Sequence, residues 1–436
     1  MPRRHPETST VEHLVIVGNG MAGHRLVEAL LARPERPARI TVIGAENAPA
    51  YNRILLSPLL AGEMQREALT LRSAEWYAEQ GIELVLGERV EAIDRDARTL
   101  TTDAGRTLDY DRLVLATGSN PARPPVPGLE LPGVHVFRDL HDADALARAA
   151  EQGGSAVVIG GGLLGLEAAE GLRKRGQGKR GMQVSLLQRD DRLMNRQLDL
   201  TAARLLESEL RGRGLDIHTD AQLESLEAGS DGRVCAARLA DGTRLAADCV
   251  VVAIGIVPNT ALARAAELDT QRGVIVDEWL TTSDPAIHAL GECCEHRGNL
   301  YGLVEPIWRQ VEVLADCLFG KPSTGYVEAP TATKLKVSGV ALYAFGPTEP
   351  ESDHEVLSYR DPQQGDYRRL LLRGGRLEGA VLYGDTASGP WYFEQALAGV
   401  DLTACRTALL LGAADAQVLL DDALNESPQR PAKEAA

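Results

Sequence analysis

The sequence predicts an α/β protein, because one supersecondary plan occurs twice along its 436 residues. Residues 13–46 and residues 155–189 each predict a strand, a glycine-rich turn, a helix, a loop and a second strand. The two second strands end at equal distances from their leading glycines, at Glu46 and at Gln188. From about residue 330 the pattern changes to short strands followed by helices, which predicts a small α+β domain at the C-terminal end.

The first glycine-rich turn has the pattern Gly18-x-Gly20-x-x-Gly23, between the first strand and the helix. Gly18 permits a tight turn, Gly20 lets a pyrophosphate approach the backbone, and Gly23 allows the helix to pack closely on the strand. The helix N-terminus presents free N–H groups to the phosphate. Glu46, at the end of the next strand, can accept both ribose hydroxyls. A tight turn without a ligand is the alternative, but strand, turn, helix and terminal acid together indicate a dinucleotide site.

The second turn repeats this pattern as Gly160-x-Gly162-x-x-Gly165. Two dinucleotide folds in one chain imply two dinucleotides, and the usual pair is a bound flavin and a diffusible nicotinamide. The predicted fold class is therefore α/β, with two Rossmann-like dinucleotide-binding domains and the small α+β C-terminal domain.

The charge balance and the apolar runs narrow the candidate partners. The formal net charge of −16 argues against nucleic acid or an anionic membrane as the main partner, and suits a partner with a basic docking patch. No apolar run approaches the roughly 18 residues that span a bilayer. The N-terminus has Arg3 and Arg4 but no separate apolar region before a cleavage site, so the expected location is the cytoplasm.

The six cysteines have no CxxC spacing, and the nine histidines have no metal-ligand spacing. We therefore predict no metal site. Cys293 and Cys294 are adjacent and follow a predicted strand that ends in Gly-Glu, so they could form a working dithiol or serve only as core packing. No cysteine precedes residue 235, and a bridge between neighbouring residues strains the peptide between them. Buried, unreactive thiols are the favoured interpretation.

Several stretches resemble a known family. "LVLATGSNP" and "IHALGEC" match two strands of the two-dinucleotide flavoprotein reductases, which belong to the pyridine nucleotide-disulfide oxidoreductase superfamily. "YNRILLSPLLAGE", "GLVEPIW", "TKLKVSGV" and "GAVLYGDT" are more specific. Together they resemble the FAD- and NADH-binding portion of the assimilatory nitrite reductase large subunit, over nearly the whole chain. Rubredoxin and ferredoxin reductases share the general plan, with less of the C-terminal match.

The resemblance implies a glutathione reductase-like fold and an FAD-dependent NAD(P)H oxidoreductase. Such a protein passes electrons from NAD(P)H via FAD to a separate redox protein, here expected to be a nitrite or nitrate reductase component of nitrate assimilation. One alternative is a rubredoxin or ferredoxin reductase unrelated to nitrogen. The other is a flavin-bound binding or sensor module with little turnover. A homodimer is one option for the assembly.

Two departures from the family qualify this expectation. The family's nitrite reductases continue into Cys-rich iron–sulfur and sirohaem regions that are absent from these 436 residues. The second predicted nicotinamide strand ends in Gln188-Arg189, where NADH-binding members carry an acid. Gln188 can hydrogen-bond a ribose hydroxyl but cannot repel a phosphate, whereas Arg189 could pair with the 2′-phosphate of NADPH. We expect NADH to be used, with NADPH rejected less sharply than in a relative that carries the acid.

The resemblance also supplies most of the predicted site residues. Glu292 is expected to accept a ribityl hydroxyl of the flavin. The predicted FAD set is Gly18, Gly20, Met21, Ala22, Gly23, Glu46, Arg53, Val90, Thr117, Gly118, Glu292 and Trp308. The predicted NAD(P) set is Gly160, Gly162, Leu164, Gly165, Glu167, Gln188, Arg189 and Gly255. Hydride is expected to pass directly between the cofactors, so no catalytic side chain is predicted, and Glu167 is a candidate nicotinamide contact.

Four of these interpretations have a plain structural alternative. Arg53 is placed near the flavin pyrophosphate by resemblance, but could be an ordinary surface arginine. Glu167 could be a simple helix-face carboxylate, and Trp308 a core aromatic residue. The basic segment 173–180 is a solvated loop, or else a guide for an acidic partner or a phosphorylated cofactor.

The predicted domain division has three parts and two terminal segments. The FAD-binding domain is expected to span residues 11–120 and 248–325, with the NAD(P)H-binding domain at 121–247. The C-terminal domain is expected at 326–420. Residues 1–10 and 421–436 are polar and are expected to be disordered.

Overall fold

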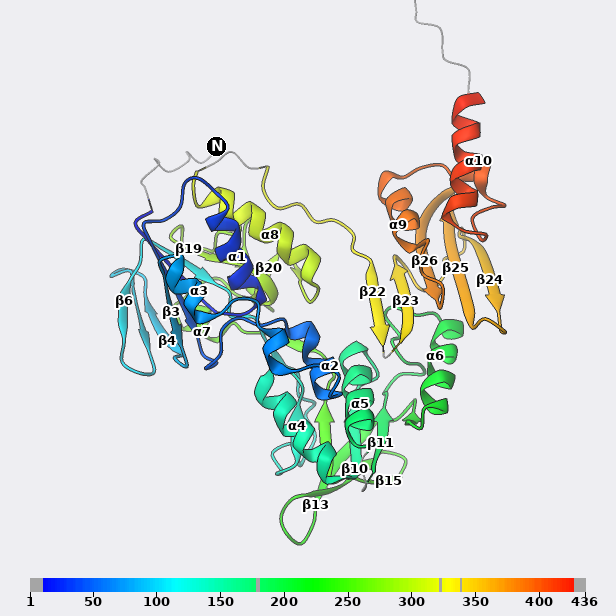
Figure 1. Cartoon of the computed structure of the whole chain (residues 1–436), viewed down its shortest axis with the longest axis horizontal. Coiled ribbons are helices and arrows are strands. Elements are labelled where there is room, and N and C mark those ends of the chain that lie inside the picture. Colours follow the sequence, from blue (N-terminus) through cyan, green and yellow to red (C-terminus); the bar gives the residue numbers. More distant parts are fainter. Residues whose placement is uncertain (1–10, 178–180, 321–323, 338, 427–436) are drawn as a thin grey trace, which may run out of the picture. The chain divides into compact units, whose positions relative to one another are not determined.

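The computed structural model describes residues 11–177, 181–320, 324–337 and 339–426 (Figure 1). The chain divides into two compact units. Unit 1 comprises residues 1–125, 135–152 and 254–329, and unit 2 comprises residues 126–134, 153–253 and 330–436. Among the described residues, no helix is long and apolar enough to cross a membrane.

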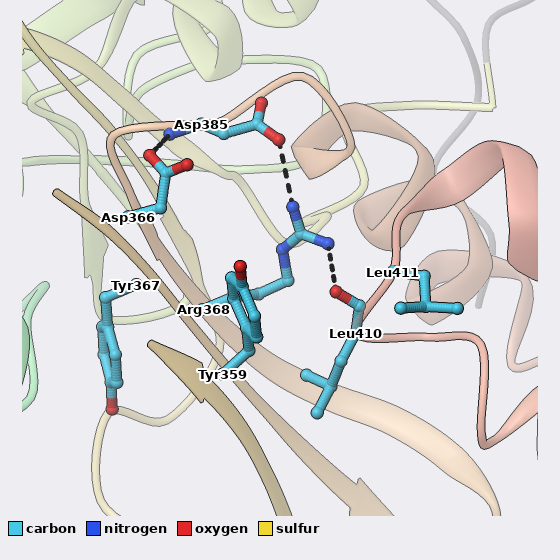
Figure 2. A pocket seen from close by; sticks show the side chains of 7 residues that line it. All are labelled: Tyr359, Asp366, Tyr367, Arg368, Asp385, Leu410 and Leu411. Carbon is cyan, nitrogen blue, oxygen red and sulfur yellow. Dashed lines mark hydrogen bonds and ion pairs between the residues drawn. The ribbon is translucent and has the colours of Figure 1, made fainter. Parts of the chain in front are cut away.

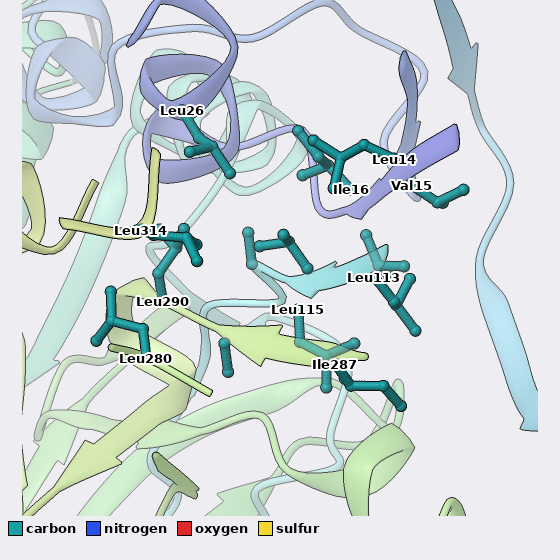
Figure 3. Close-up of a cluster of buried hydrophobic side chains, with 14 of the residues drawn as sticks. Leu14, Val15, Ile16, Leu26, Leu113, Leu115, Leu280, Ile287, Leu290 and Leu314 are labelled. Atoms are coloured by element: carbon teal, nitrogen blue, oxygen red, sulfur yellow. The ribbon is translucent and has the colours of Figure 1, made fainter. Parts of the chain in front are cut away.

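Unit 1 is built on a five-stranded parallel sheet in the order β19-β7-β1-β2-β3. Its strands are β1 (His13–Val17), β2 (Arg39–Gly44), β3 (Ile82–Leu86), β7 (Arg112–Leu115) and β19 (Ile287–Ala289). All five residues of β1 are buried, as expected for a parallel sheet that is covered on both faces. The helices α1 (Met21–Leu31) and α8 (Val304–Cys317) contribute Leu26 and Leu314 to the same apolar core as Leu14 and Ile16 (Figure 3).

Shorter elements surround this sheet. The helical ones are η1 (Arg53–Leu55), α2 (Leu56–Leu60), η2 (Arg66–Leu69), α3 (Ala74–Glu79), α4 (Leu140–Gln152), α7 (Ala261–Ala265) and η3 (Gly291–Cys293). The strands form small sheets: β4 (Val90–Asp94) with β5 (Thr99–Thr102) and β6 (Thr107–Asp109), β8 (Ser119–Pro121) with β17 (Ile256–Pro258), and β18 (Val274–Val276) with β20 (Cys294–His296) and β21 (Asn299–Leu300).

Unit 2 contains four strands of a second five-stranded sheet, whose order is β12-β11-β10-β16-β9. The strands of this sheet are β9 (Val134–Val136), β10 (Gly154–Ile159), β11 (Met182–Leu187), β12 (Asp216–His218) and β16 (Cys249–Val252). Only the first residue of β9 belongs to unit 2, because residues 135–152 belong to unit 1. The helices α5 (Leu163–Arg175) and α6 (Leu200–Gly212) follow β10 and β11 in sequence. An antiparallel sheet of β13 (Leu223–Ala228), β14 (Val234–Leu239) and β15 (Arg244–Ala246) completes this part.

The C-terminal part of unit 2 is an antiparallel sheet in the order β22-β23-β26-β25-β24. The strands are β22 (Thr333–Val337), β23 (Val340–Phe345), β24 (Glu355–Asp361), β25 (Asp366–Arg373) and β26 (Arg376–Tyr383). They are followed by α9 (Gly389–Ala398), η4 (Thr403–Cys405) and α10 (Ala413–Glu426). The apolar core of this part includes Leu370 and Leu382 from the sheet and Leu420 from α10. The predicted α/β class with a small α+β domain is thus confirmed.

Two details differ from the expected organisation. Residues 421–426 were expected to be disordered, but they form the end of α10, which Leu420 anchors to the core. Residues 173–175 end α5 and are therefore helical, while residues 178–180 of the same basic segment lie outside the described residues, as do 1–10 and 427–436. The predicted three-domain boundaries remain a prediction. The two units cut the chain at other points, with α4 in unit 1 and β16 in the sheet of unit 2.

Candidate functional site: two glycine-rich turns

The first glycine-rich turn links β1 to α1, and each glycine has a separate steric reason. Gly18 has φ +121°, and a Cβ there would lie 2.1 Å from the carbonyl oxygen of Ala116. A Cβ on Gly23 would lie 2.1 Å from the oxygen of Gly18, so helix and turn pack as closely as backbone allows. Around Gly20, by contrast, nothing lies within 4 Å of an added Cβ. The turn is closed at its outer glycines and open at its middle one.

The second turn, between β10 and α5, has the same geometry. Gly160 has φ +116°, and a Cβ on Gly165 would lie 1.8 Å from the oxygen of Gly160. The position of Gly162 is open in the same way as that of Gly20. Both helices begin after the middle glycine, without a side-chain cap and without an acid in the first turn. Each N-terminus therefore leaves its N–H groups and its positive dipole end to an anion.

Glu46 follows β2, and its carboxylate is held from two sides. The Arg53 guanidinium donates to Oε1 through Nη2, and the Tyr51 hydroxyl donates to Oε2 at 2.8 Å. The Arg53 guanidinium also lies 5.0 Å from the centre of the Tyr51 ring. Burial raises the pKa of Tyr51, so its hydroxyl stays a donor. Arg53 is therefore no isolated surface arginine, because it orients the acid that sequence reasoning assigned to the ribose.

Glu292 lies in η3, after β19, and it is also paired with an arginine. The Arg138 guanidinium and the Ser119 hydroxyl both donate to Oε2, the latter at 2.7 Å. Arg138 and Ser119 were missed by the sequence analysis, since they lie 154 and 173 positions from Glu292. Arg53 Nη1 donates to the carbonyl oxygen of Arg138 at 2.8 Å. A continuous set of contacts thus joins Glu46 to Glu292.

The first turn also contains a buried donor with no partner. Nδ2 of Asn19 is buried and unpaired, while its Oδ1 accepts from the Tyr77 hydroxyl at 3.3 Å. The same hydroxyl lies 2.6 Å from Nδ1 of His24, which is buried. A buried unpaired donor costs free energy that a ligand acceptor can recover. Beside the open space at Gly20, Asn19 fits a phosphorylated nucleotide in this turn, and the sequence analysis missed it.

The remaining predicted flavin residues are dispersed around this turn. Met21 and Ala22 open α1, and a Cβ on Gly291 would lie 3.2 Å from Cβ of Ala22, so η3 contacts the start of this helix. Thr117 donates to the carbonyl oxygen of Asn259 at 3.1 Å, and Gly118 has φ +65°.

Val90 and Trp308 pack on the core of unit 1. Val90 is buried there. Trp308 lies in the second turn of α8 and is partly buried against the same core, with the Arg25 guanidinium 5.8 Å from its ring centre. Trp308 is therefore a core contact, and its contact with the flavin stays a prediction.

The residue after β11 that is predicted to bind the nicotinamide nucleotide differs from Glu46, because it is neutral and buried. Gln188 is 7% exposed, and its amide is engaged at both ends: Oε1 accepts from the N–H of Gly161 at 2.8 Å, and Nε2 donates to Asp190 at 3.0 Å. The Arg189 side chain is 81% exposed. Leu164 and Glu167 lie in the first turns of α5 and are partly buried. Gly255 has φ +123° and belongs to unit 1.

Cys293 and Cys294 are fully buried free thiols. The Cys293 thiol donates to the carbonyl oxygens of Leu115 and Leu290, both at 3.3 Å, and the Cys294 thiol to that of Gly291 at 3.2 Å. Burial raises the pKa of both thiols, and that of Cys294 strongly. The thiolate is the reactive form of cysteine, so these positions favour inert packing.

A pocket of about 200 Å³ lies in the C-terminal part of unit 2, and none of its lining residues is predicted to bind a cofactor. Figure 2 shows the buried Arg368 at its centre, donating to Asp385 and to the carbonyl oxygen of Leu410. These contacts connect β25 to the segment after β26 and to the segment before α10. Within the described ranges, no group of three or more His, Cys, Asp or Glu could hold a metal ion.

Comparison with known proteins defines the class. Residues 12–313 match the pyridine nucleotide-disulphide oxidoreductase family, and residues 331–396 match the rubredoxin NAD+ reductase C-terminal domain. The chain belongs to the pyridine nucleotide-disulphide oxidoreductase family. This family uses FAD and NAD(P)H, so the predicted pair of cofactors and the predicted enzyme class are confirmed.

Individual relatives refine this placement. The chain is 43% identical over 392 residues to nitrite reductase [NAD(P)H] of Bacillus subtilis, covering 90% of this chain and 48% of that protein. It is 38% identical over 399 residues to the assimilatory nitrate reductase electron transfer subunit of the same organism, covering 92% of this chain and 51% of the relative. The chain therefore spans about half the length of these curated relatives.

Among solved structures, the covalent putidaredoxin reductase–putidaredoxin complex matches with a TM-score of 0.82 and 30% identity, over 95% of this chain and 99% of that one. The predicted resemblance to this family and to nitrite reductase sequences is confirmed.

Proposed function

We propose that this chain uses FAD to pass electrons from NAD(P)H to a separate redox protein, and that this partner is a component of nitrite or nitrate reduction. The observation that carries the proposal is the pair of glycine turns, each closed at its outer glycines and open at its middle glycine. The relatives named for nitrite and nitrate reduction support the acceptor class. The work of such a chain would take place in the cytoplasm.

The first turn is assigned to FAD. Bound FAD supplies the capacity to accept two electrons from a nicotinamide and to release them to a carrier. Gly20, Met21 and Ala22 present backbone N–H groups to the pyrophosphate, and Asn19 offers a further donor. Glu46 accepts the adenosine ribose hydroxyls while Arg53 and Tyr51 fix its orientation.

At the other end of the flavin, Glu292 accepts a ribityl hydroxyl. Arg138 and Ser119 hold its carboxylate in place. The assigned FAD set is completed by Gly18, Gly23, Val90, Thr117, Gly118 and Trp308.

The second turn is assigned to the nicotinamide nucleotide. Gly160, Gly162 and Gly165 shape the phosphate cradle, and Leu164 lines the first turn of α5. Glu167 is the assigned contact for the nicotinamide carboxamide. The assigned NAD(P) set is completed by Gln188, Arg189 and Gly255.

Neither thiols nor a general base are needed in this scheme. The chain's task is to bind two nucleotides, orient them and exclude water. The buried thiols of Cys293 and Cys294 pack in the apolar core of unit 1 and carry no electrons.

A second candidate function is that of a rubredoxin or ferredoxin reductase unrelated to nitrogen. The match to the rubredoxin NAD+ reductase C-terminal domain and the fold of the putidaredoxin reductase complex favour it. Both candidates share the cofactor chemistry and differ only in the acceptor.

The two candidates are separated by an acceptor panel with NADH as the donor. The panel contains rubredoxin, a [2Fe–2S] ferredoxin, and a nitrite reductase variant that keeps its iron–sulfur and sirohaem regions but lacks its own FAD- and NADH-binding portion. We expect kcat/KM to be highest with the reductase variant. Preference for rubredoxin or ferredoxin would establish the second candidate instead. Flavin reduction by NADH without turnover on any acceptor would identify a sensor module.

A further inference from the structure

A carboxylate lies two residues past Gln188, the position where the expected acid is missing. Oδ2 of Asp190 accepts from Nε2 of Gln188 and from Nδ2 of Asn195, both at 3.0 Å. The other end of the Gln188 amide accepts from the N–H of Gly161, in the glycine turn itself. Two hydrogen bonds through one buried side chain therefore connect the turn to this carboxylate.

The two oxygens of Asp190 have different surroundings. Oδ2 accepts the hydrogen bonds of the two amides, whereas Oδ1 lies 3.9 Å from Nε of the exposed Arg189 side chain. The Asp190 side chain is 39% exposed, so it faces outward from the same edge of the sheet that buries Gln188. Both ends of the Gln188 amide already form a hydrogen bond within the protein and the side chain is buried, whereas Oδ1 of Asp190 lies on a partly exposed side chain that a ligand can reach.

We propose that Asp190, positioned by Gln188 and Asn195, is the residue that selects NADH over NADPH. A carboxylate at this edge accepts ribose hydroxyls through charge-assisted hydrogen bonds and repels a 2′-phosphate. Gln188 then serves as a positioning residue, which accounts for a neutral amide at the strand end. This inference rests on the proposed function of the second turn and assigns its selectivity.

Arg189 is the opposing group, because its guanidinium could attract a 2′-phosphate. Its side chain is 81% exposed and lies 3.9 Å from Asp190. An exposed cation of this kind contributes little through a single pair and is screened by salt. Asp190 is fixed by two hydrogen bonds, so its repulsion of the phosphate outweighs the attraction of Arg189.

The test measures the affinity of the FAD-loaded protein for NAD+ and for NADP+ by isothermal titration calorimetry. The wild type should bind NAD+ at least ten-fold more tightly than NADP+. Asp190→Asn keeps an acceptor for Gln188 and Asn195 but removes the charge. We expect its NAD+ affinity to fall about ten-fold and its NADP+ affinity to rise. The ratio of NAD+ affinity to NADP+ affinity should therefore approach one.

The matched control is Asp191→Asn, which removes the neighbouring carboxylate. That carboxylate is 57% exposed and contacts Arg192 at 3.3 Å. The Asp191→Asn variant should have the same ratio of NAD+ affinity to NADP+ affinity as the wild type. If Asp190→Asn leaves the ratio unchanged, or if Asp191→Asn changes it equally, the inference is overturned.

A second variant tests the positioning role of Gln188. Gln188→Met should lower the NAD+ affinity, and combining it with Asp190→Asn should add little, because both changes remove one interaction. Additive losses would show that Gln188 acts independently of Asp190. Tm values accompany every variant to separate misfolding from lost binding. If the wild type holds FAD but binds neither NAD+ nor NADP+, the proposed function of the second turn fails, rather than the assignment of Asp190.

Discussion

The two glycine-rich turns have nearly the same backbone and very different strand ends. Their leading glycines have φ values of +121° and +116°, and their third glycines leave no room for a Cβ. At the end of β2, Glu46 is a charged group, 36% exposed, held by Arg53 and Tyr51. Past the end of β11, Gln188 is neutral, 7% exposed and bonded back to its own turn.

This difference separates two functions of the strand–turn–helix–strand motif. The glycine-rich turn and the helix N-terminus recognise a pyrophosphate, and both motifs have the same turn and helix geometry. The strand-end side chains and their partners decide which nucleotide is bound and how tightly. Glu46 with an arginine and a tyrosine suits a permanently bound cofactor, whereas a neutral amide and an outward carboxylate suit one that exchanges.

The largest effect is expected from Gly165→Ala, because the new Cβ would meet a backbone oxygen at 1.8 Å and cannot be accommodated by a side-chain shift. We expect a loss of about 3 kcal/mol or more in the stability of unit 2, with NAD+ binding lost and FAD retained. Gly162→Ala is the control, since the space around it is open, and it should weaken NAD+ without changing Tm. Thermal unfolding with FAD quantification checks both variants. Loss of FAD from Gly165→Ala would contradict the assignment of FAD to the first turn alone.

Acid should affect unit 1 through His288, which is buried in β19. Burial lowers the pKa of His288 to about 4 from 6.5, so below pH 6.5 the unfolded chain binds a proton that the folded chain does not. Stability falls as the pH drops from 6.5 to about 4, by about 2 kcal/mol at pH 5 and about 3 kcal/mol in full.

The check is denaturant unfolding of wild type and His288→Leu at pH 7.5 and pH 5. The variant should lack this part of the pH dependence. Equal slopes in the two proteins would show that His288 titrates normally in the fold.

Substitutions at the two strand ends should weaken nucleotide binding by different amounts. Glu46→Ala removes an acceptor of charge-assisted hydrogen bonds and should weaken FAD by about 1.5–3 kcal/mol. Gln188→Ala removes a neutral amide and should weaken NAD+ by about 0.5–1.5 kcal/mol. Both values come from equilibrium binding to the apoprotein and to the FAD-loaded protein, respectively. A smaller loss of FAD affinity in Glu46→Ala than of NAD+ affinity in Gln188→Ala would contradict this comparison of the two strand ends.

The smallest effect is expected at Asn19. Asn19→Ala removes the unpaired Nδ2 donor, and FAD affinity should fall by about 1 kcal/mol. Tyr77→Phe, which removes only the hydroxyl that orients Asn19, should cost less. The matched control is Asn299→Ala, at an exposed position of β21, which should leave FAD binding unchanged. An unchanged affinity in Asn19→Ala would mean that its amide does not face the nucleotide.

Sequence reasoning predicted the features that are local in the chain. Both turns, their helices and the acid at Glu46 follow from spacing within one supersecondary unit. Arg138 and Ser119 could not be predicted, because their approach to Glu292 depends on the packing of segments more than 150 positions away. Asp190 was overlooked because the expected acid was sought at the strand end, and the amide that holds it becomes visible only in the folded turn. Polar residues 421–426 suggested disorder, although the apolar face of the preceding turns docks α10.

The central claim is that this chain stores electrons on FAD alone and that its adjacent cysteines are inert. An anaerobic titration of the FAD-loaded protein with NADH, followed by flavin absorbance, tests it most directly. We expect full bleaching after one equivalent of NADH per flavin, both in the wild type and in the Cys293→Ser/Cys294→Ser variant. A second equivalent consumed by the wild type but not by the variant would show that the thiols accept electrons, and would contradict the account.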